Sequence, residues 1–211
     1  MTAPESIVFV VDDDPSVRRA IKRLIESVGL KVELLGSAQE FRVLQRPDVP
    51  SCLVLDIRLP GISGLDFQRQ LAEANIHIPI IFITGHGDIR MSVRAMKARA
   101  VEFLTKPFHD QDLLDAIQLA LEKDRSRRGR EMGLAALRER FESLSPRERE
   151  VVSMVASGML NKQVAAQIGI AENTVKVHRS RAMEKLQAQS TADLVKMIET
   201  LRVFSQQEQV N

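Results

Sequence analysis

The chain of 211 residues contains no tryptophan, no tyrosine and a single cysteine, and aromatic residues make up only 4% of it. The lone thiol, Cys52, can form neither an internal disulfide nor a thiolate metal cage, so we expect it to pack in a core. No apolar run in the sequence is long enough to cross a bilayer. No basic region precedes the first apolar run, so we expect no secretory signal and predict a cytoplasmic protein without a membrane partner.

Charge is unevenly divided along the chain. Residues 1–123 carry 15 basic and 17 acidic side chains, whereas residues 124–211 carry 15 basic and 11 acidic ones. The second part is therefore mildly basic, which permits a polyanionic partner. Proteins that bind single-stranded nucleic acid use aromatic stacking platforms, and this part has few aromatic residues, so duplex DNA is the favoured partner.

Apolar runs alternate with helical repeats in the first half. Five segments predict strands, at residues 7–11, 31–35, 53–55, 78–83 and 101–104, and apolar residues at helical spacing follow each of them. The segment 31–35 is expected to be an edge strand. This alternation is typical of an α/β fold with a doubly wound parallel sheet of five strands. The hydrophobic content of 44% is ample for its core.

Polar residues stand at the carboxyl ends of four of these strands. Asp12 and Asp13 follow the first strand, Asp56 the third, Thr84 the fourth and Lys106 the fifth. In an open α/β sheet, ligands bind in the crevice at these strand ends, so we expect the five side chains to converge there.

The residue types in this crevice indicate phosphoryl transfer. Three neighbouring carboxylates favour a hard divalent cation, and Mg²⁺ prefers oxygen ligands. An aspartate carboxylate is a nucleophile for phosphoryl groups. Mg²⁺ and the Lys106 ammonium would each neutralise one equatorial oxygen of the transferring group, and the Thr84 hydroxyl would donate a hydrogen bond to the third. We therefore predict that Asp56 is the phosphoacceptor, whereas Asp14 only caps the helix that begins at Pro15.

The first half resembles the receiver domains of response regulators over about residues 5–122. The matching pieces are Asp12-Asp13, Asp56 with LPGISG downstream, Thr84 with GHGD after it, and Lys106-Pro107-Phe108. The resemblance implies a flavodoxin-like receiver with strand order 2-1-3-4-5 and a sensor histidine kinase as phosphoryl donor. One departure is Arg99, at a position where many relatives carry glycine.

The resemblance also implies roles for individual residues. It places Mg²⁺ on Asp12, Asp13, Asp56 and the backbone carbonyl of Arg58, and it makes Thr84 and Phe103 a conformational switch. The protein would then catalyse only its own phosphorylation and dephosphorylation, so we do not expect a metabolic enzyme.

The connector, residues 123–143, is rich in arginine, glutamate and alanine. We predict a solvated helical linker that Gly129 and Gly133 interrupt, and the pattern leaves open whether it is one helix or two. The cluster Arg127-Arg128-Gly129-Arg130 is either solvated or in contact with DNA phosphates.

The second half predicts an all-α domain over residues 144–204. Ser145-Pro146-Arg147-Glu148 is typical of a helix start with a capping box. Asn161 is expected to cap the next helix, and Glu172-Asn173 to open a third helix with a basic face. Two short helices joined by the tight turn at residues 168–171 predict a helix-turn-helix.

Residues 144–190 resemble the LuxR-type DNA-binding domain of NarL/FixJ response regulators, and the order of domains is most similar to the FixJ type. The motifs are LSPREREV, GMLNKQVAAQIGI and ENTVKVHRSRAMEKL. The resemblance implies that Lys176, Val177 and Ser180 face bases in the major groove. It further implies a set of residues that hold phosphates, namely Asn161, Lys162, Thr174, Arg179 and Arg181.

The last predicted helix, residues 191–204, has more apolar positions than one buried stripe requires. Either a second copy of the chain covers the excess or the same molecule does. Residues 205–211 are polar and are expected to form a disordered tail.

Together these features predict a two-component response regulator with a receiver at residues 1–122. Phosphorylation of Asp56 would control homodimerisation and binding to double-stranded promoter DNA, and RNA polymerase is a further candidate partner. The alternative is a phosphorelay intermediate or phosphate sink without DNA-directed output.

Overall fold

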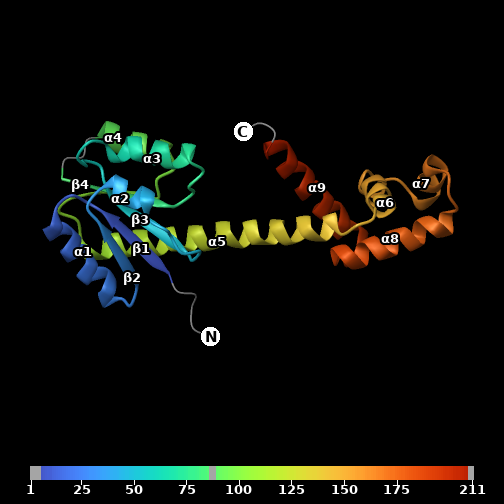
Figure 1. Cartoon of the computed structure of the whole chain (residues 1–211), viewed down its shortest axis with the longest axis horizontal. Helices are drawn as coiled ribbons and strands as arrows, with labels where there is room; N and C mark the ends of the chain where they lie inside the picture. The colour runs from blue at the N-terminus through green and yellow to red at the C-terminus, as the bar shows by residue number, and fades with distance from the viewer. Residues whose placement is uncertain (1–5, 86–88, 209–211) are drawn as a thin grey trace. The chain divides into compact units, whose positions relative to one another are not determined.

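A computed structural model of the chain describes residues 6–85 and 89–208 (Figure 1). It divides into two compact units, Met1–Arg128 and Gly129–Asn211. Residues 86–88 of the GHGD motif and residues 209–211 of the expected tail lie outside the described residues. Within the described ranges, no helix has the length and apolar character needed to span a membrane.

The first unit contains a five-stranded parallel sheet, which confirms the predicted fold class. Its strands are β1 (Ile7–Val11), β2 (Lys31–Leu35), β3 (Ser51–Asp56), β4 (Ile80–Thr84) and β5 (Glu102–Thr105). They lie in the order β2-β1-β3-β4-β5, and each neighbouring pair is parallel. From β1 the chain adds β2 on one side and then returns to add β3 on the other, so the direction of strand addition reverses between β1 and β3. The carboxyl ends of these two strands therefore flank the crevice.

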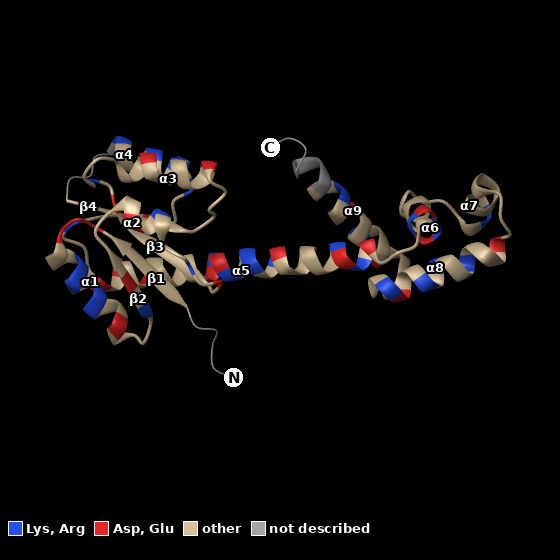
Figure 2. Cartoon of the chain, viewed as in Figure 1, with Lys and Arg blue, Asp and Glu red and all other residues tan. Residues whose placement is uncertain are grey.

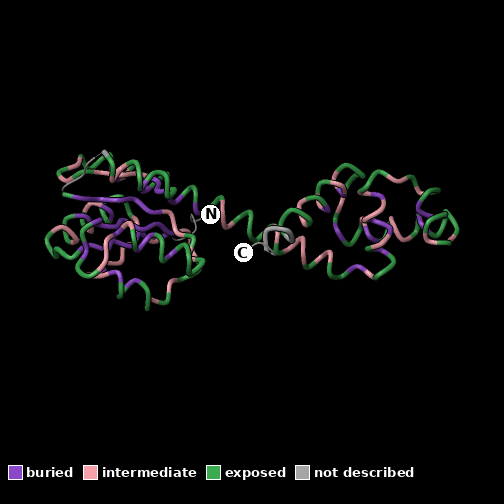
Figure 3. Tube along the Cα trace, turned by 90° about the horizontal axis from the view of Figure 1, so that it is seen from above, coloured by how far each residue is buried: buried purple, intermediate pink, exposed green. Residues whose placement is uncertain are grey.

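Helices cover both faces of this sheet (Figure 1). One core joins the sheet to α1 (Pro15–Ser27) and to the first turns of α5 (Asp110–Glu142). The other joins it to three helices, α2 (Ala38–Val43), α3 (Gly64–Glu73) and α4 (Ile89–Lys97). The central strands are therefore buried on both sides (Figure 3), which explains why they read as unbroken apolar runs.

The connector is part of a single helix, because α5 runs without interruption from Asp110 to Glu142. The predicted breaks at Gly129 and Gly133 are wrong. Side-chain contacts stabilise the first part of this helix against the first unit. The carboxylate of Asp124 is fully buried and accepts hydrogen bonds from the Ser51 backbone N–H at 3.0 Å, from Arg127 at 2.6 Å and from Arg128 at 2.7 Å. These two arginines are thus engaged within the first unit, where Arg128 also pairs with Asp48.

Replacing Asp124 by alanine should lower the free energy of unfolding of the first unit by about 2–3 kcal/mol, because the Ser51 N–H and two guanidinium groups lose their shared acceptor. Urea unfolding followed by circular dichroism measures this change. Asp115→Ala, at an exposed position on the same helix, is the matched control and should stay within about 0.5 kcal/mol of the parent chain. Equal effects of the two substitutions would contradict the prediction.

The second unit packs four helices around a core of its own. They are α6 (Pro146–Ala156), α7 (Asn161–Ile168), α8 (Glu172–Leu186) and α9 (Thr191–Glu208). Val151, Val164, Val175 and Leu186 are fully buried at its centre. Gly169 adopts a left-handed conformation with φ of 69°, which ends α7 and makes the tight turn into α8.

Two predicted boundaries in this unit are wrong. Asn161 is the first residue of α7 rather than its cap, because the N–H of Leu160 is held by the Gln163 side chain. The last helix does not end at residue 204 but continues through Glu208. Leu194 and Ile198 of α9 are buried in the unit's core, whereas Val203 and Phe204 are 53% and 38% exposed. The unit therefore covers only part of the apolar surface of α9.

The capping box at the start of α6 is confirmed and is linked to α8. Ser145 Oγ accepts from the Glu148 N–H, and the Ser145 N–H donates to Glu148 Oε2 at 2.8 Å. Lys185 Nζ of α8 lies 2.7 Å from the same oxygen. The hydrogen bond from Lys185 is the main cause that lowers the pKa of Glu148 below its ordinary value.

Because the pKa of Glu148 is lowered by folding, its contribution to stability is fully present above the ordinary glutamate pKa of about 4.3 and is lost as the pH falls through the lowered folded value. Comparing urea unfolding of the parent chain with Glu148→Gln isolates this group from the other carboxylates. The stability difference between the two should be constant near pH 7 and should shrink below about pH 4.3. A difference that does not change with pH would contradict this assignment.

Candidate functional site

The polar residues predicted to converge do meet at the carboxyl edge of the sheet. Lys106 Nζ lies 2.6 Å from Asp12 Oδ2 and 2.8 Å from Asp56 Oδ2, although these residues come from three different strand ends. Asp12 is fully buried, Asp56 is 7% exposed and Asp13 is exposed. One ammonium thus pairs with two of the three clustered carboxylates, which leaves this set of four side chains with a net negative charge.

Backbone groups hold the two buried carboxylates in place. The Asp14 N–H donates to Asp12 Oδ1 at 2.8 Å, and the Arg58 N–H donates to Asp56 Oδ1 at 2.9 Å. Arg18 from α1 donates to the Asp12 carbonyl. The second oxygen of each carboxylate is then left facing Lys106, so the charged groups are already oriented before a phosphoryl group arrives.

Burial and hydrogen bonding shift the pKa values of this cluster. Burial is the largest influence on Asp12 and raises the pKa of its carboxyl above the ordinary value, although the hydrogen bond from Lys106 opposes the shift. For Lys106, burial alone would lower the pKa, but hydrogen bonds and charges from Asp12 and Asp56 together raise it. Lys106 is therefore held in its charged form next to Asp56.

The acidic residues fit a divalent cation. Ligand oxygens of Asp12, Asp13 and Asp56 lie within 4.8 Å of one another. Mg²⁺ binds carboxylate oxygens and keeps several waters, so one ion can be shared by this set without a complete protein cage. The set supplies only oxygen donors, which disfavours softer metals. The Arg58 carbonyl remains a predicted ligand, and the structure records only the backbone N–H of Arg58 in contact with Asp56.

The two predicted switch residues lie on neighbouring strands. Thr84 ends β4 and is fully buried, and its carbonyl accepts from the Lys106 N–H at 2.7 Å. Phe103 in β5 is half-buried and packs against the core that contains α4. Thr84 is therefore connected to the Lys106 segment, while the switch role of the pair stays a prediction.

Sequence reasoning missed the role of Gly64, the first residue of α3. A Cβ atom placed there would lie 2.5 Å from the Asp56 carbonyl oxygen and 3.0 Å from Ile57 Cα, which are both backbone atoms. The Gly64 N–H donates to the Ile57 carbonyl at 2.8 Å. The glycine thus lets the start of α3 approach the phosphoacceptor strand, and no signal in the sequence marked this close approach.

Gly64→Ala should move the segment after Asp56 and lower the free energy of unfolding by about 1–3 kcal/mol, because backbone atoms cannot give way as a flexible side chain can. Thermal unfolding and the rate of phosphorylation would both report this change. Gly129→Ala in α5 is the matched control, since its Cβ meets nothing within 4 Å, and it should be neutral or stabilising. A parent-like melting temperature for Gly64→Ala would contradict the proposed close approach.

The predicted base-contacting residues lie on one exposed part of α8. Lys176, Val177 and Ser180 are exposed, and Lys176 Nζ lies 3.3 Å from Glu172. The basic residues of α8 recur along the helix (Figure 2). These residues are therefore accessible on α8, and their contact with bases stays a prediction.

The predicted phosphate-contacting residues differ in their exposure and in their contacts with the rest of the unit. Lys162, Thr174 and Arg181 are exposed. Arg179 instead donates to the Asn161 side chain at 3.2 Å and to the Thr191 hydroxyl, so it connects α7, α8 and α9. Its contribution to the packing of the unit was not visible in the sequence, because the contacts span 18 and 12 positions.

Family comparisons agree with this division into two parts. The family described as the response regulator receiver domain matches residues 8–118. The luxR family of bacterial regulatory proteins matches residues 142–198. The chain belongs to the response regulators. Its receiver is followed by a LuxR-type DNA-binding domain, so this response regulator is a transcriptional regulator of the NarL/FixJ type.

Full-length relatives share both domains with this response regulator. It is 59% identical to nodulation protein W of Bradyrhizobium diazoefficiens, over 94% of this chain and 88% of the relative. It is 46% identical to the response regulator TodT of Pseudomonas putida, over 96% and 89% of the two chains. The solved structure of the response regulator StyR matches with a TM-score of 0.82 at 48% identity, and covers 93% of this chain and 99% of StyR.

Proposed function

We propose that Asp56 accepts a phosphoryl group from a sensor histidine kinase and that this modification controls DNA binding by the second unit. The observation that carries the proposal is the contact of Lys106 with both Asp12 and Asp56, because it places a cation where negative charge develops during phosphoryl transfer. A carboxylate oxygen of Asp56 would form the new bond to phosphorus as the bond to the donor breaks.

Each residue around Asp56 would have its own role in the phosphoryl transfer. Lys106 would pair with one phosphoryl oxygen, and the Thr84 hydroxyl would donate to another. Mg²⁺ held by Asp12, Asp13, Asp56 and the Arg58 carbonyl would supply the remaining positive charge. These groups act through position and charge, so the receiver needs no separate acid or base.

The phosphorylated state would be communicated through Thr84 and Phe103. Movement of Thr84 towards the phosphoryl group would free space for Phe103, which packs against the core beneath α4. The surface formed by α4 and β5 would then change and permit pairing of two receivers. The exposed Val203 and Phe204 of α9 offer a second surface for a homodimer.

A dimer would present two copies of α8 to a DNA site with two-fold symmetry. Lys176, Val177 and Ser180 would contact bases, whereas Asn161, Lys162, Thr174, Arg179 and Arg181 would hold phosphates or support the residues that do. Domain boundaries near residues 122 and 144 are part of this proposal. The stretch between them then connects the receiver to the output domain within α5.

A combined experiment tests this function. The full chain with Mg²⁺ and acetyl phosphate would be examined by sedimentation and used to select bound genomic fragments. We expect phosphorylation to shift the monomer towards a dimer and to enrich duplex fragments that contain a two-fold repeat. Efficient phosphorylation without enrichment of any DNA would instead support a phosphate sink.

A further inference from the structure

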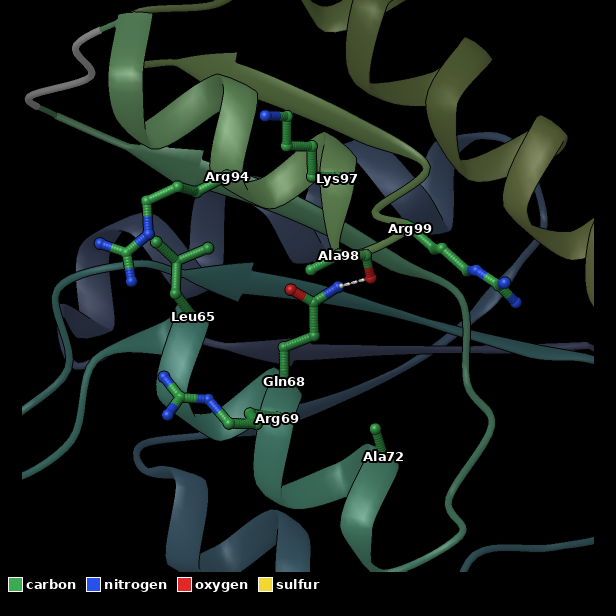
Figure 4. A pocket seen from close by; sticks show the side chains of 8 residues that line it. All are labelled: Leu65, Gln68, Arg69, Ala72, Arg94, Lys97, Ala98 and Arg99. Atoms are coloured by element: carbon green, nitrogen blue, oxygen red, sulfur yellow. Dashed lines mark hydrogen bonds between the residues drawn. The ribbon is translucent and has the colours of Figure 1, made fainter. Parts of the chain in front are cut away.

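A pocket lies between α3 and α4, and none of its lining residues belongs to the acidic site (Figure 4). Its volume is about 510 Å³. This lies within the range of roughly 300–1,000 Å³ that is usual for small-molecule sites. Leu65, Ala72 and Ala98 give the pocket an apolar surface.

Gln68 places an unused hydrogen-bond acceptor in this pocket. Its side-chain amide nitrogen donates to the Ala98 carbonyl at 2.8 Å, which fixes the orientation of the amide group. Gln68 is only 8% exposed, and its Oε1 atom is buried without a hydrogen-bond partner among the described residues. In Figure 4 this oxygen points towards the side of the pocket where Leu65 and Arg94 lie. A ligand that donates an N–H or O–H would satisfy it.

Cations surround the same pocket. Arg69 pairs with Asp66 at 2.6 Å, so its charge is already compensated. Arg94, Lys97 and Arg99 form no ion pair with another described residue. Their charged ends point in different directions in Figure 4, and Arg94 is the cation on the side towards which Gln68 Oε1 points. Arg94 is therefore placed to pair with an anionic group such as a phosphate, which accepts hydrogen bonds from guanidinium.

Arg99, which lines the pocket, has an unusual backbone conformation. Arg99 follows α4 with φ of 65°, in the left-handed region that favours glycine. Its N–H donates to the Met96 carbonyl at 3.0 Å, so the turn is part of the helix end. An arginine thus stands where the backbone conformation favours a residue without a side chain, and its side chain lines the pocket.

We propose that this pocket binds a small phosphorylated molecule that carries a flat ring with an N–H donor. The ring lies against Leu65 and Ala98 and donates to Gln68 Oε1, while the phosphate pairs with Arg94. A guanidinium group also stacks favourably on a flat ring. Purine mononucleotides combine these three chemical features, and the proposal does not depend on phosphorylation of Asp56.

Isothermal titration calorimetry on the full chain tests the proposal with four probes. Guanosine monophosphate and adenosine monophosphate carry both the ring and the phosphate, guanosine lacks the phosphate, and inorganic phosphate lacks the ring. We expect at least one of the two nucleotides to bind saturably and at least about tenfold more tightly than guanosine or inorganic phosphate. Equal affinity for inorganic phosphate, or saturable binding by none of the probes, would overturn the proposal.

Variants then locate the binding. Gln68→Leu removes the buried acceptor, and Arg94→Gln removes an exposed cation without disturbing the core; each should weaken nucleotide binding by about tenfold. Arg23→Gln, at an exposed position on α1, is the matched control and should bind as the parent does. Arg94→Gln keeps the test valid if Gln68→Leu unfolds. Unchanged affinity in Arg94→Gln would place the nucleotide elsewhere and overturn the assignment.

Discussion

The Asp56→Asn variant is expected to gain no phosphoryl group from acetyl phosphate or from a phosphorylated kinase. Asparagine has nearly the same shape, and its side-chain oxygen can still accept from the Arg58 N–H, but its amide is not a nucleophile for phosphorus. Intact mass measured over the time course of the reaction would show a complete loss of the labelled species.

An exposed carboxylate outside the acidic cluster controls for this result. Asp112 is exposed in the first turn of α5, so Asp112→Asn removes one negative charge without altering the crevice. This variant should be labelled as fully as the parent chain. If Asp56→Asn still gained the label, the phosphoacceptor would have to be another residue.

The Lys106→Met variant is expected to be phosphorylated about 10²–10³-fold more slowly than the parent chain, because one preorganised cation no longer meets the transferring group. Methionine retains much of the length and apolar character of the lysine side chain, so the change is mainly the loss of charge. Single-turnover labelling at saturating Mg²⁺ would measure the rate.

A second measurement separates this electrostatic role from a structural one. Removing Lys106 leaves the carboxylates of Asp12 and Asp56 without their shared cation, so Mg²⁺ should bind more tightly to Lys106→Met than to the parent. Lys22→Met, at a half-buried position on α1 where the lysine pairs with Glu26, should alter neither the rate nor the affinity. A labelling rate within about threefold of the parent would contradict the role assigned to Lys106.

The sequence was sufficient to predict the parallel sheet and the convergence of Asp12, Asp56 and Lys106. Each buried strand is an unbroken apolar run that ends in a polar residue, and parallel pairing then leads these residues to one edge. The resemblance to receivers supplied the strand order, and the observed order agrees with it.

Features that depend on contacts between distant residues could not be predicted. A glycine is required at position 64 because a Cβ atom there would lie too close to the Asp56 carbonyl oxygen. The pocket at Gln68 forms only because α3 lies beside α4. The continuity of α5 through Gly129 and Gly133 was missed because glycine propensity is only a weak guide. Asp124 could have been noticed, since Arg127 and Arg128 follow at the helical spacings that allow ion pairs.

The most direct test of phosphocontrol is the affinity of the full chain for a selected duplex, measured by fluorescence anisotropy at one salt concentration before and after phosphorylation. The account predicts that affinity rises by about tenfold or more in the parent chain and does not change in Asp56→Asn. Equal affinity of the parent chain before and after complete labelling would contradict it.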